Sequence, residues 1–170
     1  GLYVVYANTN PKVGMLQGTS SFLVPRDTPG LTVARCNETL GCRFMNNGEL
    51  VFEDMEVPAE NLIGKIGDGA HYAFGVLDVG RLGLAAATLG AAKDAIDRCV
   101  QYAGQREAFG RKIQDFQAVQ FMLAEMAGDT YAIENMVYRT AWMGGGGERF
   151  NREAAMCKLF ATETAAITTR

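Results

Sequence analysis

Two arginines with acidic, aromatic and amide neighbours are the residues of this sequence best suited to binding a ligand. Asp78 and Arg81 are three positions apart, so their side chains share one face if the segment is helical. Arg106 follows 25 positions after Arg81, which is about seven turns of 3.6 residues and returns it to nearly the same side of one helix. Guanidinium groups hydrogen-bond phosphate oxygens in pairs and stack on flat rings. This spacing therefore predicts a helix edge that binds a long anionic ligand.

The residues after Arg106 add apolar faces and an amide. Phe109 and Phe116 offer aromatic rings, and Gln117 can both donate and accept hydrogen bonds. Each candidate also has an ordinary structural explanation. An Asp–Arg pair at this spacing is often a surface ion pair worth a few tenths of a kcal/mol. Gln117 suits the first turn of a helix, and Phe116 suits a core position.

The composition narrows the possible partners. The chain has 170 residues, 48% of them hydrophobic, and a formal net charge of -3, which is enough for one substantial core or two small ones. This slightly acidic balance gives no general attraction to nucleic acid or to a membrane surface. No run approaches the roughly 20 apolar residues of a membrane span. One histidine and four cysteines without paired spacing predict no metal site, and Cys99 and Cys157 read as reduced core residues.

Residues 1–58 read as a partial antiparallel β domain. Turn residues separate short apolar runs, and Asn47-Gly48 predicts a type I′ hairpin because both central positions of that turn need positive φ. The predicted strands are Leu2–Ala7, Ser21–Val24, Leu31–Ala34 and Leu50–Val57.

Residues 59–170 read as a helical bundle, so the fold class is α+β. One helix, apolar on two faces, runs from the cap Asp68 to about Gln105. A second, capped by Asp115, ends at Met143 before four glycines. A third starts at Asn151, with Ala154, Cys157, Ala161 and Ala165 facing inward. Three long helices with short connections fit an up-and-down bundle whose fourth helix lies beyond Arg170; the chain also starts within a predicted strand, so we expect it to be part of a longer protein.

Six segments together resemble the acyl-CoA dehydrogenase flavoproteins. They occur in order through nearly the whole chain, and their number makes the resemblance specific. The segments are Glu49–Asn61, Gly67–Gly69, Leu77–Arg81, Arg106–Gly110, Phe116–Gln120 and Leu123–Ala127.

The resemblance implies N-terminal helices, a middle β domain and a C-terminal four-helix bundle, assembled as a homotetramer or dimer. It implies FAD as the cofactor. Arg106 would reach the FAD of a neighbouring subunit, with Phe109, Phe116 and Gln117 against its nucleotide half. Leu77, Asp78 and Arg81 would lie by the nucleotide end of an acyl-CoA substrate. Ala108 lacks the hydroxyl with which some members bond the cofactor.

The implied reaction is α,β-dehydrogenation of an acyl-CoA thioester, in which a carboxylate takes the α-proton and a hydride passes to flavin N5. An electron-transfer flavoprotein would then accept the electrons. Most members place the base beyond Arg170, and the minority position is Gly80 here, so we assign no catalytic residue. The implied location is the cytoplasm, or the mitochondrial matrix in a eukaryote.

Three alternatives remain open at this point, one of which is a bare helical bundle that binds no ligand. A flavin oxidase acting on an acyl-CoA or a nitroalkane would share the fold and the cofactor. A non-catalytic subunit that completes a partner's FAD site would keep Arg106 and Gln117 and tolerate the missing base.

Overall fold

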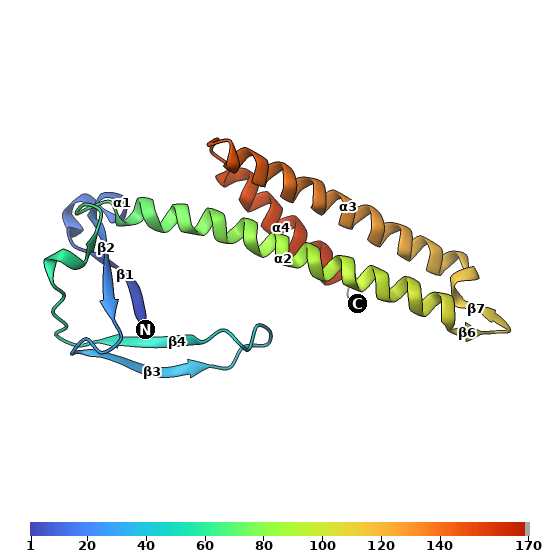
Figure 1. Ribbon diagram of the computed structural model, residues 1–170, viewed down its shortest axis with the longest axis horizontal. Helices are drawn as coiled ribbons and strands as arrows, with labels where there is room; N and C mark the ends of the chain where they lie inside the picture. Colours follow the sequence, from blue (N-terminus) through green and yellow to red (C-terminus); the bar gives the residue numbers. More distant parts are fainter. Residues whose placement is uncertain (169–170) are drawn as a thin grey trace. The chain divides into compact units, whose positions relative to one another are not determined.

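The structure is a computed structural model that describes residues 1–168. The chain divides into two compact units, Gly1–Phe74 and Gly75–Arg170. The helix α2 (Gly69–Gln105) begins in the first unit and continues through the second (Figure 1). The domain boundary after residue 58 stays a prediction.

The first unit holds two antiparallel sheets, as the short apolar runs predict. Strand β1 (Leu2–Asn8) pairs with β2 (Thr19–Pro25) from Leu2 opposite Pro25 to Asn8 opposite Thr19, and β5 (Leu62–Ile63) adds to the other edge of β2. The second sheet pairs β3 (Leu31–Asn37) with β4 (Asn47–Phe52). Three short helical segments complete the unit: η1 (Pro11–Val13), α1 (Met15–Gly18) and η2 (Ala59–Asn61).

The hairpin predicted at Asn47-Gly48 is wrong. Both residues belong to β4, where Asn47 pairs with Asn37 and Gly48 with Cys36. The connection is residues 38–46, and its residue with positive φ is Cys42, at 50°. Pairing with β3 thus includes Asn47 and Gly48 in strand β4, and the turn lies several residues earlier in the chain. Strand β4 also ends at Phe52, before the predicted Val57.

The second unit contains the three long helices that the periodicity predicts. They are α2, α3 (Gln117–Gly145) and α4 (Asn151–Thr168). Two predicted details of α3 are wrong. Its N-cap is Phe116, because Asp115 closes the preceding 3-10 turn η3 (Ile113–Asp115). Its C-terminal end extends through Gly144 and Gly145 rather than stopping at Met143.

A close contact explains why α3 continues into the glycine run. The Phe150 ring covers Gly144 so closely that a Cβ there would lie 3.0 Å from Phe150 Cε1. This contact offsets part of the cost of glycine in a helix. Gly146 then caps α3 with φ −81°, and Gly147 turns the chain toward α4 with φ 79°.

Residues of all three helices share one core, and α3 and α4 approach one another most closely. Cys157 is buried there as predicted, and its Sγ lies 3.2 Å from Thr140 Oγ1. Cys99, also predicted in the core, is exposed. Of the inward positions predicted on α4, three are buried and Ala165 is half-buried. The core residues are Ala85 and Leu89 of α2, Ile133 and Val137 of α3, and Cys157 and Ala161 of α4.

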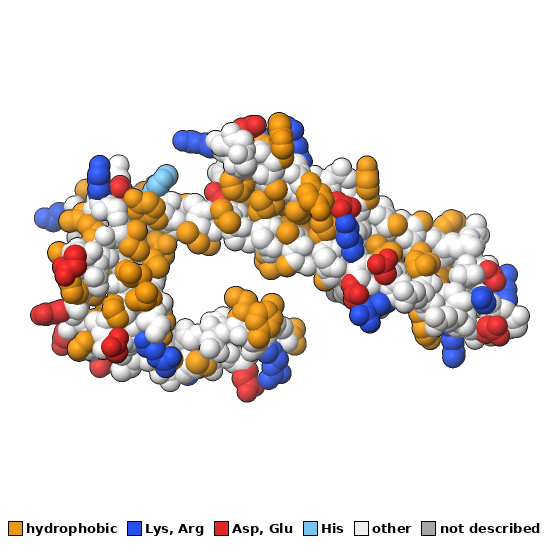
Figure 2. Space-filling model, viewed as in Figure 1, with side chains coloured by type: hydrophobic (Ala, Val, Ile, Leu, Met, Phe, Trp, Pro, Cys, Tyr) orange, Lys and Arg blue, Asp and Glu red, His pale blue; other side chains and the backbone are white. Residues whose placement is uncertain are grey.

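Helix α2 keeps many large apolar side chains exposed, among them Leu77, Leu84 and Tyr102; exposed hydrophobic side chains along the helices are visible in Figure 2. Its length and composition alone would suffice to cross a membrane, contrary to the expectation that no run of the sequence approaches one, and 11% of its most apolar window is buried. The core helix of a bundle meets the same criterion. Two apolar faces on one helix fit that explanation better.

An ion pair between Lys93 of α2 and Glu134 of α3 joins two of the helices. The hydrogen bond to the Glu134 carboxylate raises the pKa of Lys93 above its ordinary value of 10.5. A raised pKa in the folded state means that the pair stabilises the fold fully below pH 10.5. This stabilisation is lost as the pH rises through the folded-state pKa.

We therefore expect Lys93→Met in the full-length protein to lower the Tm slightly at neutral pH. The difference in Tm between this variant and the wild type should disappear in strongly alkaline buffer. Thermal melts from neutral to strongly alkaline pH measure this difference. Glu134→Gln should show the same pH dependence. A difference in Tm that does not change with pH would contradict the prediction.

Candidate functional site

A two-residue hairpin connects α2 to the start of α3. Strand β6 (Glu107–Ala108) pairs with β7 (Arg111–Lys112), leaving Phe109 and Gly110 as the turn. Their φ angles are 53° and 77°, as a type I′ turn requires. The sequence predicts a break at Phe109-Gly110, and the structure shows that the break is this turn, which lies beyond the end of α2 in Figure 1.

The turn holds aromatic and cationic side chains together. The rings of Phe109 and Phe116 meet edge to face, with centroids 6.4 Å apart and planes at 85°. The guanidinium carbon of Arg111 lies 4.0 Å from the centre of the Phe116 ring. Phe116 is half-buried, whereas Phe109 is 97% exposed. The hairpin therefore exposes the ring of Phe109, next to the Phe116 ring, on which Arg111 is stacked.

Arg106 is fixed through its backbone on both sides. Its N–H donates to the Tyr102 carbonyl at 2.8 Å, and its own carbonyl accepts from the Ile113 N–H at 2.9 Å. Its side chain is exposed and forms no ion pair within residues 1–168. Arg106 lies one position beyond the last residue of α2, so the helix edge expected to carry both arginines carries only Arg81.

Gln117 is the first residue of α3 and is exposed. The N-cap Phe116 supplies no side-chain hydrogen bond to the helix, so the positive end of the helix dipole faces this site uncapped. Gln120 Nε2 donates to the Gln114 carbonyl at 3.0 Å and ties the hairpin exit to the first turn of α3. The four residues expected at the cofactor thus share one short segment; their contact with a ligand stays a prediction.

Asp78 and Arg81 form the ion pair that their spacing predicts. Arg81 Nη1 donates to Asp78 Oδ1 at 2.7 Å, and their side chains are 40% and 20% exposed, respectively. Leu77, next to them, is about half exposed. At 1.5 Å per residue, Arg81 and Arg106 lie about 38 Å apart along the chain axis. That distance is several Debye lengths, so the two guanidinium groups do not reinforce one another electrostatically.

Two of the helix carboxylates are held in ion pairs. Glu134 is paired with Lys93, and Glu153 is paired with Arg152, whose hydrogen bond lowers the Glu153 pKa. A lowered pKa weakens a carboxylate as a base. At the minority position, Gly80 faces open space. Residues 1–168 also hold no cluster of three potential metal ligands.

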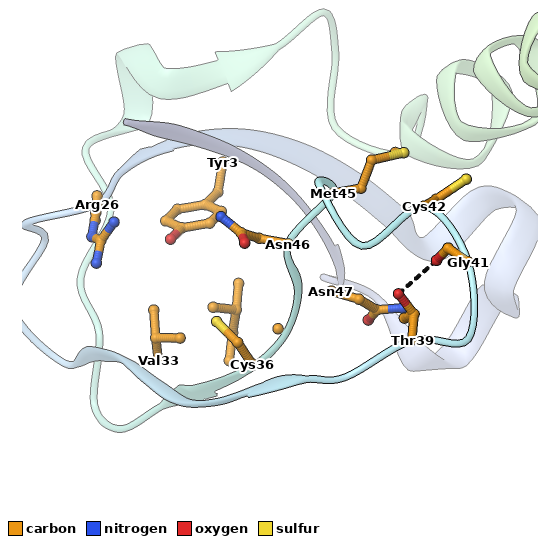
Figure 3. A pocket seen from close by; sticks show the side chains of 12 residues that line it. Tyr3, Arg26, Val33, Cys36, Thr39, Gly41, Cys42, Met45, Asn46 and Asn47 are labelled. Carbon is orange, nitrogen blue, oxygen red and sulfur yellow. Dashed lines mark hydrogen bonds between the residues drawn. The ribbon is translucent and has the colours of Figure 1, made fainter.

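Two cavities are lined by none of the predicted site residues. One of about 440 Å³ lies between α2, α3 and the end of α4 and is mostly apolar; Tyr102, Ile113 and Met122 are among its lining residues. The other, of about 670 Å³, lies within the first unit. In Figure 3, Tyr3 and Asn46 point toward its centre, and Thr39 Oγ1 donates to the Gly41 carbonyl at 2.7 Å on one side.

Arg111 is the residue at the hairpin that the sequence reasoning missed. The segment considered there ended at Gly110. Phe-Gly is not among the residue pairs that signal a two-residue hairpin, so the sequence gives no sign that Arg111 pairs with Ala108.

Comparisons with known proteins identify the family of the chain. The family model described as "Acyl-CoA dehydrogenase, C-terminal domain" matches residues 67–170. The chain is 43% identical to an acyl-CoA dehydrogenase of Bacillus subtilis over 96% of this chain and 43% of that protein. The structure of butyryl-CoA dehydrogenase from Megasphaera elsdenii superposes with a TM-score of 0.93 at 37% identity, covering 99% of this chain and 44% of that one.

A structure of PigA with FAD and proline gives a TM-score of 0.93 at 28% identity, covering 98% of this chain and 43% of that chain. The chain therefore spans less than half the length of the relatives it matches. On the match of the family model to residues 67–170, the chain belongs to the acyl-CoA dehydrogenase family.

Proposed function

We propose that the whole protein is an FAD-dependent acyl-CoA dehydrogenase that works as a homo-oligomer and passes its electrons to an electron-transfer flavoprotein. The observation that carries this proposal is the β6–β7 hairpin, where the unpaired guanidinium of Arg106 lies in the same short segment as the exposed ring of Phe109. Family membership supports the reaction class. The proposed location is the cytoplasm, or the mitochondrial matrix in a eukaryote.

The chemistry of the hairpin fits a flavin dinucleotide. A guanidinium suits diphosphate oxygens, an exposed ring suits a flat base, and the Gln117 amide suits the polar edge of a base or ribose. Phe109 is fully displayed although a non-glycine residue at positive φ is strained. Such a conformation is unfavourable for the protein alone, and stacking on a bound ring would offset its cost. When bound, FAD supplies the hydride acceptor for the β-hydrogen of the substrate.

Asp78 and Arg81 are proposed to hold the nucleotide end of the acyl-CoA, beside Leu77. The 2.7 Å bond to Asp78 uses Nη1 of Arg81. The other N–H groups of this guanidinium remain free for a phosphate or for stacking on adenine. Asp78 Oδ2 has no partner among the described residues and can accept from an adenine amine.

Arg81→Gln is expected to raise the KM for acyl-CoA about tenfold and to leave the FAD content unchanged, because one charge-assisted contact to the carrier is lost. Steady-state kinetics of the full-length protein measure it. Arg98→Gln is a matched control, since Arg98 forms a 2.7 Å ion pair with Asp94 on the same helix. Equal KM values for the two variants would contradict the assignment.

The reaction is tested with the full-length protein purified under air and then made anaerobic. A flavin absorbance band that bleaches on addition of an acyl-CoA, with an enoyl-CoA product, supports the dehydrogenase. Rapid peroxide formation on readmitting air would instead identify an oxidase. Bound flavin that no acyl-CoA bleaches would identify a non-catalytic subunit.

A further inference from the structure

Arg106 and Arg111 project from the same face of the β6–β7 hairpin. The ladder pairs Ala108 with Arg111 and Glu107 with Lys112, and the bond from Ile113 N–H to the Arg106 carbonyl continues it by one pair. Side chains alternate between the faces of a strand, and directly paired residues share a face. By this register Arg106, Ala108, Arg111 and Ile113 share one face, whereas Glu107 and Lys112 share the other.

The guanidinium of Arg111 is held in place but not neutralised. It stacks 4.0 Å over the centre of Phe116, and within residues 1–168 it forms no ion pair. Stacking uses the flat face of the group and leaves the N–H donors at its edge free. The side chain directly paired with it across the hairpin is the small methyl group of Ala108.

Two unpaired cations on one small face predict an anion between them. Diagonal neighbours in an antiparallel pair lie about 7–8 Å apart at their Cα atoms, and a diphosphate has oxygens on two phosphorus atoms to meet both groups. We propose that Arg111 binds the diphosphate of the dinucleotide together with Arg106, with its plane fixed by the Phe116 ring. This assignment rests on the proposed FAD function and adds a second guanidinium to it.

The test compares three variants of the full-length protein in their FAD dissociation constants. Arg111→Gln should weaken FAD binding about tenfold, because a charge-assisted contact is lost. Arg111→Lys keeps the charge but loses the planar fork and should lie between Arg111→Gln and the wild type. Lys112→Gln removes the same charge from the opposite face of the hairpin and should bind FAD within about twofold of the wild type.

Two further readouts separate binding from folding. The Tm of the apoprotein should be the same for Arg111→Gln and Lys112→Gln. Raising the salt concentration should weaken FAD binding less in Arg111→Gln than in the wild type, because one fewer charge contacts the ligand. Combined with Phe116→Leu, the Arg111→Gln effect should shrink, since the stacking partner is then already absent.

The outcomes distinguish this inference from the function on which it rests. Wild-type protein that retains no FAD would overturn the proposed function and this inference with it. Wild-type protein that binds FAD, alongside an Arg111→Gln variant of equal affinity, would overturn only the role of Arg111. Equal losses in Arg111→Gln and Lys112→Gln would show a general charge effect and would also overturn it.

Discussion

Replacing Arg106 by glutamine is expected to weaken FAD binding by about a hundredfold, so that the full-length variant is purified largely colourless. The guanidinium can donate two parallel bonds to the diphosphate, each strengthened by charge. The backbone of Arg106 is held by Tyr102 and Ile113, so the group meets its ligand with little loss of backbone freedom. The ratio of flavin to protein absorbance after gel filtration, followed by FAD titration, measures the effect.

Arg139→Gln is the matched control for that variant. Arg139 is an exposed arginine of α3 whose guanidinium lies 4.9 Å from the centre of the Trp142 ring, so it resembles the hairpin arginines in charge and aromatic contact. Its loss should leave FAD binding unchanged. An Arg106→Gln protein that keeps its flavin as well as Arg139→Gln does would remove the hairpin from the cofactor site.

The largest expected effect on stability comes from Ile133→Ala. Ile133 is 1% exposed and lies in the core shared by α2, α3 and α4. Removing its side chain deletes buried methyl groups and leaves a cavity, which costs about 2–5 kcal/mol. Urea unfolding of the full-length protein measures the loss. Asn135→Ala, an exposed position two residues further along α3, should stay within about 0.5 kcal/mol of the wild type; similar losses for both variants would contradict the core assignment.

The sequence predicts the long helices well because their apolar periodicity and their packing agree. Asn151 starts α4 as expected, and Ala154, Cys157 and Ala161 are buried together. The ends of the helices were less predictable, because they depend on contacts with residues elsewhere in the chain. The Phe150 ring over Gly144 is such a contact, and glycine propensity alone does not foresee it.

The two candidate turns show how local preference and tertiary pairing compete. Asn47-Gly48 has the residues that a type I′ turn prefers, yet pairing with β3 draws both into a strand. Phe109-Gly110 has a poorer first residue for positive φ and nevertheless forms that turn. The pairing of β6 with β7 between α2 and α3 leaves the chain two residues in which to reverse. A local preference was therefore overridden in each case by what the flanking elements required.

The candidate site was predictable by residue type but not by arrangement. Arg106, Phe109, Phe116 and Gln117 were chosen for what their side chains can bind, and the structure gathers them around one hairpin. The expected single edge for both arginines required α2 to continue through Arg106, and α2 ends at Gln105. Arg111 emerged only from the pairing register, because nothing in its sequence position marks the face on which it lies.

The four consecutive glycines between α3 and α4 have unequal freedom to vary. A methyl group at Gly144 would lie only 3.0 Å from the Phe150 ring, and Gly147 has a positive φ that other residues rarely adopt. A side chain at Gly145 would meet nothing within 4 Å, and one at Gly146 would make only ordinary contacts. Across related genes, substitutions should therefore accumulate at the two inner positions of the run while the outer two stay glycine. Only two of the four glycines are then required by the fold.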